Sequence, residues 1–341
     1  MKQRLRSLDP AWFAMVMATG IVALAAHVEG VPRIPTGLLW LSIAFYGVLC
    51  VAYLARLVLF PRAHLADLRS HGRAMGYFTL PAATAVLGVD VFTIAASVGA
   101  ARSLWFATAA LWLVLVYAVP VALVIQPDKP AFEKGLQGTW LVWVVATQGT
   151  ATLGTDVATT FGAGTHQMLL LTTSVWLVGG MFYLWVIQLI VRRLFFRPLD
   201  PDELSPTYWI DMGAVAISAL AGAALLQHVA EYPLLAKLAP FVAGVTMLFW
   251  AVATWWIPWL VVMGVWRHGI RRQPLTFEVG LWGLVFPLGM YTVATRTTAD
   301  VLRLPALATI ASGFVWIAIV AWAATIADLI VTPLLQKRRH P

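Results

Sequence analysis

Few side chains in this sequence carry chemistry, and their spacing does not assemble an active site. The seven histidines and the single cysteine show no metal-ligand spacing, and there is no phosphate-binding glycine loop and no nucleophile pattern. What remains is three ionisable residues inside or at the ends of long apolar stretches: Asp90, Asp211 and Arg296. Ionisable groups at membrane depth are costly and are candidate functional residues by default. The sequence therefore predicts no enzyme, no metal site and no cofactor.

Each of these three residues has more than one interpretation. Asp90 and Arg296 could form an ion pair in the outer half of the membrane. Arg296 could instead attract anions at the outer mouth, or extend its side chain to the interface. Asp211 could attract a cation or carry a proton, although a solvated carboxylate at the inner mouth is the simpler reading. All three are electrostatic candidates, and the residues alone leave these alternatives open.

The composition determines which solvent surrounds the chain. Of its 341 residues, 61% are hydrophobic and 11% charged, whereas a soluble domain carries about 25% charged residues. One core cannot bury so much apolar surface, so the excess must face the lipid bilayer. Cys50 is the single cysteine, which leaves no disulfide framework within the chain. A cytosolic enzyme, a nucleic-acid-binding protein and a disulfide scaffold are thereby excluded.

Ten apolar stretches approach or exceed the roughly 20 residues that a helix needs to cross a bilayer. With the N-terminus in the cytoplasm, the inside segments contain 18 of the 23 Lys and Arg residues, as the positive-inside rule requires. We therefore predict a multi-pass protein of the cytoplasmic membrane with both termini in the cytoplasm. Residues 1–341 form one all-α transmembrane domain with spans at about 10–28, 36–59, 76–98, 103–125, 136–154, 166–190, 207–229, 236–265, 277–298 and 305–331.

The odd-numbered stretches are rich in small and hydroxyl residues, whereas the even ones are bulky. Anchored at Ala18, Ala82, Thr147, Gly213 and Leu288, the odd stretches recur every 64 to 75 residues, which indicates five repeated helical hairpins. Residues 1–27 also resemble a cleaved signal peptide, but the first stretch belongs to the repeat. Small residues let helices approach closely. The odd helices therefore form either a solid interior or a ring around a narrow, mostly uncharged passage.

Three segments resemble the tellurite-resistance/C4-dicarboxylate transporter family: Phe13–Val22, Trp143–Gln148 and Phe286–Gly289. This family includes bacterial TehA-like channels, fungal malate and sulfite transporters, and the slow anion channel of plant guard cells. The resemblance implies five hairpins in a quasi-fivefold arrangement around a central pore, with odd helices inside and even helices outside, assembled as a homotrimer. It also implies transport of small anions.

The resemblance assigns Phe286, beside Pro287, as the gate of the pore, and places Phe78 as a second aromatic near it. Asp211 stands where relatives would be expected to have an amide. Hydroxyl groups would bind a passing anion weakly, although threonine hydroxyls also bond their own helix carbonyls. The remaining residues predicted to line the pore are Thr19, Gly20, Pro81, Thr84, Thr147, Gly149, Gly213, Ser218 and Gly289.

Three functions follow from these observations. The first is passage of small anions, whether monovalent anions, sulfite or C4-dicarboxylates, through the gated pore. The second is proton-coupled dicarboxylate symport that uses Asp90 or Asp211. The third is a membrane enzyme or sensor without a conduit, which would need a catalytic cluster that the sequence does not contain.

Overall fold

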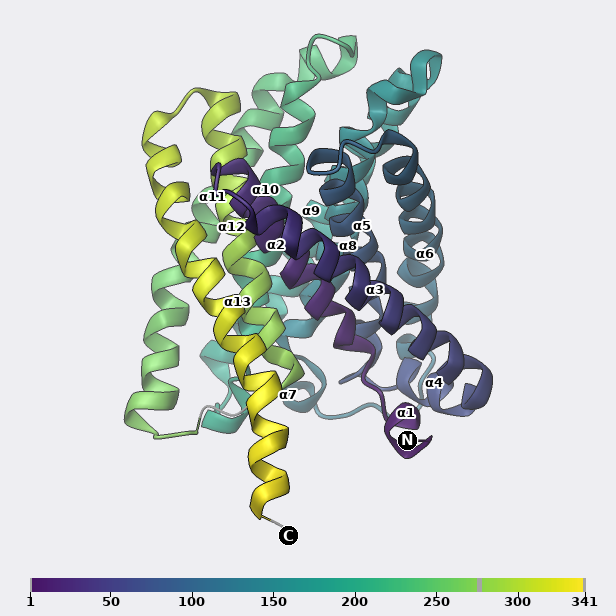
Figure 1. Cartoon of the computed structure of the whole chain (residues 1–341), viewed down its shortest axis with the longest axis vertical. Helices are drawn as coiled ribbons and strands as arrows, with labels where there is room; N and C mark the ends of the chain where they lie inside the picture. Colours follow the sequence, from purple (N-terminus) through teal and green to yellow (C-terminus); the bar gives the residue numbers. More distant parts are fainter. Residues whose placement is uncertain (1, 275–277, 340–341) are drawn as a thin grey trace.

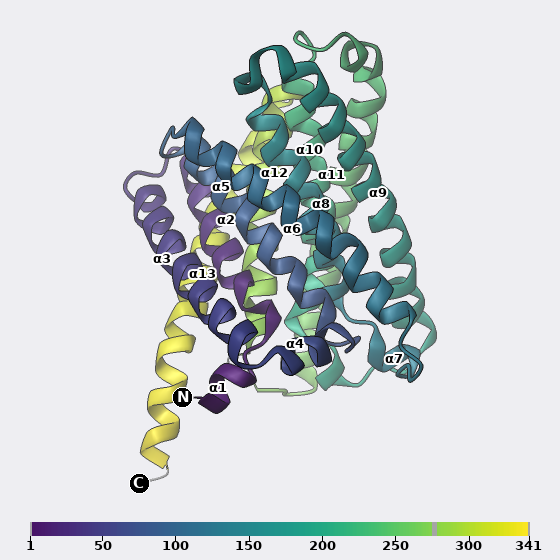
Figure 2. The same ribbon diagram turned by 90° about the vertical axis from the view of Figure 1, so that its right-hand side faces the viewer.

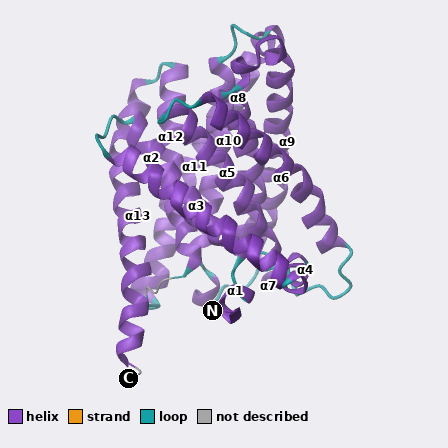
Figure 3. Cartoon of the chain, turned by 45° about the vertical axis from the view of Figure 1, so that its right-hand side comes forward, coloured by secondary structure: helices purple, strands orange, loops and turns teal. Residues whose placement is uncertain are grey.

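The computed structural model describes residues 2–274 and 278–339, and every regular element in these ranges is a helix (Figure 3). The N- and C-termini lie at the same end of the molecule (Figure 1). We call this end the terminal face. Eight helical segments are long and apolar enough to cross a membrane. The chain is therefore a multi-pass integral membrane protein.

Ten helices in the described ranges have at least 15 residues, and three short ones lie at the terminal face. The short helices are α1 (Lys2–Arg6), α4 (Pro61–Leu68) and α7 (Phe132–Gly135). The long helices are α2 (Ala14–Val28), α3 (Ile34–Leu59), α5 (Thr79–Thr93), α6 (Val98–Val124), α8 (Val142–Asp156), α9 (Thr165–Phe196), α10 (Ile210–Gln227), α11 (Pro233–Gly264), α12 (Trp282–Leu302) and α13 (Pro305–Arg339).

Five of the long helices contact one another in a closed cycle. Helix α2 packs on α5, α5 on α8, α8 on α10, α10 on α12, and α12 returns to α2. We call these five the inner helices. Each of the other five, α3, α6, α9, α11 and α13, packs against the inner helix that precedes it in the chain, and we call these the outer helices. The long helices therefore form five consecutive inner–outer hairpins.

A short 3-10 helix directly precedes every inner helix, so the five hairpins also share a backbone feature. These turns are Pro10–Phe13, Ala74–Phe78, Gly138–Leu141, Pro206–Trp209 and Val279–Leu281. Two of them start with proline, which suits a helix start because its missing N–H would have no intrahelical partner there. The outer helices lack such a turn at their starts, except α9, which follows residues 158–164.

The alternation of small and bulky helices predicted from the sequence matches their burial. In the candidate spans that contain α2, α5 and α10, 72–89% of residues are buried, against 17–33% in the spans of the outer helices. Helices α8 and α12 are absent from these candidates, and both carry several threonines. Most of their residues are nevertheless buried, so neighbouring helices separate them from lipid.

The turn between α5 and α6 differs from the sequence-based expectation. Spans at 76–98 and 103–125 place this turn near residues 99–102, whereas α5 ends at Thr93 and α6 begins at Val98. Ala96 adopts a positive φ of 50° in the turn. Hydropathy did not mark the break, because residues 94–97 between the two helices are small or apolar and include neither glycine nor proline.

Candidate functional site

A small cavity lies where all five inner helices meet. It measures about 20 Å³. Every inner helix contributes at least one residue to its lining: Ile21, Leu24, Ala85, Val86, Val89, Gly149, Thr152, Ile217, Leu220 and Met290. We call this space the axial cavity. All five repeats contribute to it.

The axial cavity is apolar and barely large enough for one water molecule. Thr152 provides the one hydroxyl in its lining, and this hydroxyl donates to the carbonyl oxygen of Gln148 at 2.9 Å. A space of this size and lining stays dry. An ion in this space would lose its hydration and gain no charged partner from the lining.

Phe286 lies next to the axial cavity along α12. It precedes Met290, which lines the cavity, by four residues, so the two side chains share one face of the helix. Only 2% of Phe286 is exposed. Pro287 lies inside α12, where it cannot donate to the carbonyl of Gly283 and so weakens the helix locally. The residue predicted as the gate is thus buried one turn from the axial cavity.

Glycines on the inner helices allow the close contacts around this region. A Cβ atom on Gly213 would lie 2.7 Å from Cγ of Pro287, and one on Gly289 would lie 2.8 Å from Cγ2 of Ile21. Gly149 lines the cavity itself. Gly213 therefore allows close packing of α10 on α12, and Gly289 allows close packing of α12 on α2.

Phe78 and Pro81, predicted near the pore on the third span, lie at the start of α5. Phe78 is fully buried, and its ring stacks on that of Trp143 with centroids 6.2 Å apart. Trp143 in turn packs on Phe182 of the outer helix α9, at 4.2 Å. Pro81 is the third residue of α5, within the first turn, where proline is tolerated. Phe78 thus belongs to an aromatic stack that extends outward to α9.

Three of the predicted pore hydroxyls contact outer helices instead of the axial cavity. Thr19 accepts a hydrogen bond from Trp322 of α13 at 3.1 Å, and Thr147 accepts one from Trp112 of α6 at 2.9 Å. Thr84 bonds Tyr46 of α3 at 2.8 Å. Each threonine also donates to the carbonyl four residues earlier in its own helix. These hydroxyls therefore serve contacts between inner and outer helices.

A corresponding hydrogen bond occurs in all five hairpins. In each, an aromatic side chain of the outer helix bonds to the inner helix of the next hairpin. Trp176 of α9 donates to the carbonyl of Ser218 on α10 at 2.9 Å, and Trp250 of α11 donates to Thr295 on α12 at 3.1 Å. The bond from Trp322 to Thr19 closes the cycle. We call these five bonds the seam bonds. The hydroxyl of Ser218 donates to Ala214 of its own helix.

The predicted ion pair between Asp90 and Arg296 is not formed. Arg296 instead pairs with Glu29 at 3.6 Å and with Asp300 at 3.3 Å. The prediction missed Glu29 because it lies just beyond the first span, 267 positions away. Two carboxylates now balance the charge of Arg296, which weakens its attraction for anions.

Asp90 and Asp211 are both fully buried, and neither carboxylate has a hydrogen-bond partner among the described residues. Asp90 lies against Gly20, where an added Cβ would be 2.5 Å from its Oδ2 atom. The expectation that Asp211 is a solvated carboxylate is wrong, because Asp211 lies in the first turn of α10 and is fully buried there. Neither residue lines the axial cavity.

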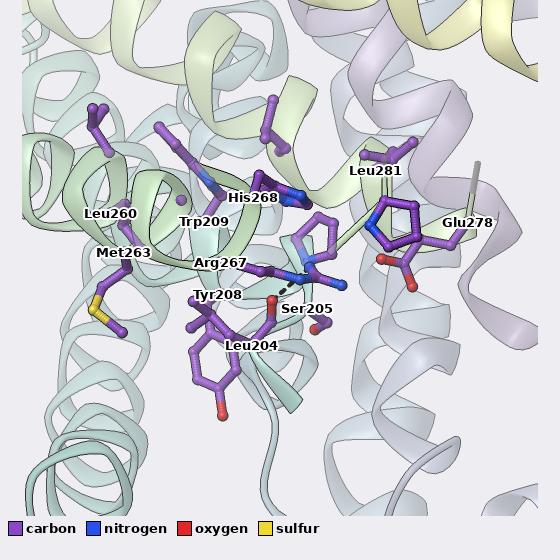
Figure 4. A pocket seen from close by; sticks show the side chains of 15 residues that line it. Leu204, Ser205, Tyr208, Trp209, Leu260, Met263, Arg267, His268, Glu278 and Leu281 are labelled. Carbon is purple, nitrogen blue, oxygen red and sulfur yellow. Dashed lines mark hydrogen bonds between the residues drawn. The ribbon is translucent and has the colours of Figure 1, made fainter. Parts of the chain in front are cut away.

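A separate pocket of about 310 Å³ at the terminal face was not anticipated from the sequence (Figure 4). It lies between the turn before α10, the end of α11 and the start of α12. Arg267 and His268 line it from a π-helical segment, Val265–Ile270, and Glu278 lies opposite. The Arg267 guanidinium donates to the carbonyl of Leu204 at 2.6 Å. The pocket thus lies beside the inner helices, outside the axial cavity.

The described residues thus form a membrane protein of five inner–outer hairpins, with an apolar cavity that all five inner helices line. The SLAC1 family, described as voltage-dependent anion channels, matches residues 7–330. The chain belongs to this family. The resemblance drawn from the first, fifth and ninth spans is thereby confirmed, and so is the prediction that the chain is not an enzyme, because this is a family of anion channels and transporters.

Individual relatives extend the comparison. The chain is 39% identical to an uncharacterized membrane protein of Mycobacterium tuberculosis over 148 residues, which are 43% of this chain and 75% of the relative. It is 22% identical to an uncharacterized transporter of Methanocaldococcus jannaschii across 94% of this chain and 92% of the relative. It is 26% identical to a sulfite efflux pump of Trichophyton rubrum across 85% of this chain and 81% of the relative.

Proposed function

We propose that this protein conducts small anions across the membrane along the axis of the five inner helices, with Phe286 as the gate. The observation that carries the proposal is the axial cavity, because residues of all five inner helices line it. Membership of an anion channel family supports the same conclusion.

We infer that ten helices cross the membrane as five quasi-fivefold hairpins. Helices α8 and α12 are too polar to be recognised by hydropathy, but an inner helix need not be apolar when its neighbours separate it from lipid. The basic residues of the loops support a terminal face on the cytoplasmic side. The homotrimer implied by the family resemblance remains a prediction, and the exposed apolar side chains of the outer helices would face lipid or a second copy.

The gate works by keeping water away from the axis. An ion that enters the axial cavity would lose its hydration and gain no charged partner there, which is a large barrier. Displacing the Phe286 ring would widen the route one turn from the narrowest point. Pro287 removes one helical hydrogen bond beside that ring, so α12 bends there at lower cost than an unbroken helix.

The size and lining of the axial cavity favour small monovalent anions. A monovalent anion loses less hydration energy than a divalent one, and the described lining contains no cation to compensate either. The name of the Trichophyton rubrum relative supports sulfite, which as hydrogen sulfite carries one charge. C4-dicarboxylates are larger and fit this cavity less well. We therefore place hydrogen sulfite, chloride and nitrate ahead of malate.

Anion flux into liposomes that contain the purified protein tests the proposal. Chloride, nitrate, sulfite and malate should be compared at equal ionic strength against protein-free liposomes. We expect protein-dependent flux of at least one monovalent anion and slower flux of malate. Liposomes that stay impermeable to all four anions, even with Phe286→Ala, would refute the proposal and favour a membrane sensor.

Proton-coupled dicarboxylate symport is the second candidate, and the burial of two carboxylates favours it. Asp90 and Asp211 lack partners among the described residues, and a carboxyl in that position is well placed to hold a proton. Malate uptake that requires a pH gradient and disappears in Asp90→Asn or Asp211→Asn would establish it. Uptake that persists in both variants after the gradient is collapsed would reject it.

A further inference from the structure

We propose that a pocket between α1, α4 and the end of α3 binds the phosphate of an anionic phospholipid headgroup. The pocket lies at the terminal face, where α1 and α4 lie near each other at the end of α3 (Figure 2). Its volume is about 440 Å³, and its charged lining consists of Arg6, Arg56, Arg62, Arg73 and Asp67. We call it the arginine pocket.

The arginine pocket has an excess of positive charge. Its single carboxylate, Asp67, is shared by two arginines: Oδ2 lies 2.6 Å from Arg56 and Oδ1 lies 2.9 Å from Nε of Arg73. No ion pair between described residues involves Arg6 or Arg62. Arg73 also lies 4.0 Å from a carboxylate oxygen of Asp9, outside the lining, so four guanidinium groups face two carboxylates and the pocket keeps an excess of positive charge.

One hydrogen-bond donor in the pocket is buried and has no partner among the described residues. Arg56 is only 1% exposed, and its Nε donates to the carbonyl of Arg6 at 3.1 Å. Its Nη1 has no hydrogen-bond partner among the described residues. A buried unsatisfied donor carries a penalty, which a phosphate oxygen would remove. The planar guanidinium suits phosphate recognition because it presents several N–H groups in one fork.

The pocket is also held in place before any ligand arrives. Arg73 donates to the carbonyl of Leu8 at 3.1 Å, and Tyr53 donates to the carbonyl of Asp9. Together with the bond from Arg56 to Arg6, these contacts fix the N-terminal segment across α3 and α4. Little ordering of these groups is therefore required on binding, which favours affinity.

The surroundings favour a lipid over a soluble phosphate. The last turns of α3 expose Leu54, Val58 and Leu59, at 63%, 77% and 59%, shortly before Arg62 of α4. Acyl chains could cover this apolar surface while the headgroup occupies the pocket at the level where the helix leaves the membrane. Arginine clusters at this level attract anionic lipids.

Lipid titration of the purified detergent-solubilised protein, followed by native mass spectrometry, tests the proposal. The probes are phosphatidylglycerol and phosphatidylcholine, with inorganic phosphate as a competitor. The test variants are Arg6→Gln and Arg62→Gln, singly and combined, because both side chains are exposed and should not be needed for folding. Arg4→Gln is the matched control, since Arg4 is exposed on the same short helix but does not line the pocket.

We expect tighter binding of phosphatidylglycerol than of phosphatidylcholine, and a loss of about fivefold in affinity for each arginine removed. Arg4→Gln should bind as the wild type does, and millimolar inorganic phosphate should not displace the lipid. Unchanged binding in the double variant, or an equal loss in Arg4→Gln, would overturn the proposal. Displacement by inorganic phosphate at lipid-like concentrations would assign the pocket to a soluble anion and overturn the lipid assignment.

Discussion

Trp322 of the last helix donates a hydrogen bond to Thr19 of the first inner helix, and this bond closes a cycle of five equivalent contacts. In each hairpin an aromatic side chain of the outer helix reaches the inner helix of the next hairpin. The hydroxyls of Thr19, Thr84 and Thr147 that take part in these contacts also donate to the carbonyl four residues earlier in their own helices. The seam bonds therefore join successive hairpins and turn hydroxyl groups away from the axis.

Removing the closing seam bond should destabilise the protein slightly. Trp322→Phe keeps an aromatic ring but removes the indole N–H, and interhelical hydrogen bonds in membranes contribute about 0.6 kcal/mol on average. We expect a lower unfolding midpoint in detergent. Trp316→Phe on the same helix is the control, because Trp316 is exposed. An equal shift in both variants would mean that the seam bond contributes nothing.

Gly20 should not tolerate a side chain. An added Cβ would lie 2.5 Å from Oδ2 of Asp90 and 2.7 Å from Cγ1 of Val86, so α2 and α5 would have to separate. We expect Gly20→Ala to cost about 1–3 kcal/mol of stability, measured by thermal unfolding in detergent.

Gly313→Ala provides the matched comparison for Gly20. An added Cβ at Gly313 meets no atom within 4 Å, so helix propensity alone should decide its effect. We expect Gly313→Ala to leave stability unchanged or to raise it slightly. A Gly20→Ala protein as stable as Gly313→Ala would show that α2 and α5 are less closely packed than described.

Stability should fall on mild acidification because of His64, in α4. Burial, and then the charge of Arg56, lower the pKa of His64 below its ordinary value of 6.5, and Asp67 opposes this in part. Its Nδ1 lies 2.7 Å from the Tyr77 hydroxyl. As the pH falls, His64 therefore takes up a proton in the unfolded chain before it does so in the folded chain. The stability that neutral His64 contributes is complete above pH 6.5 and declines below it.

Unfolding midpoints at pH 7.5 and pH 5.5 test the role of His64. We expect a smaller drop in His64→Gln than in the wild type, because glutamine keeps a polar partner for Tyr77 and does not titrate. Equal drops in the two proteins would assign the acid sensitivity to other groups.

The sequence predicted which helices lie inside, but not how each one is rotated about its own axis. Burial follows from composition, since only bulky helices can face lipid. The inner helices are small-sided all around, so nothing in their pattern distinguishes the face of Gly149, which meets the axial cavity, from that of Thr147, which bonds Trp112. Similarly, the partner of Arg296 depends on Glu29, which only the closed cycle of helices brings near.

The most direct test of the account is anion flux through Phe286→Ala compared with Phe249→Ala in liposomes. Both phenylalanines are buried, but Phe249 belongs to α11 and packs on Trp176 and Tyr183, away from the axial cavity. We predict that Phe286→Ala raises flux about tenfold, equivalent to a barrier lowered by about 1.4 kcal/mol, and that Phe249→Ala leaves it unchanged. Flux in Phe286→Ala no greater than in Phe249→Ala would contradict an axial gate.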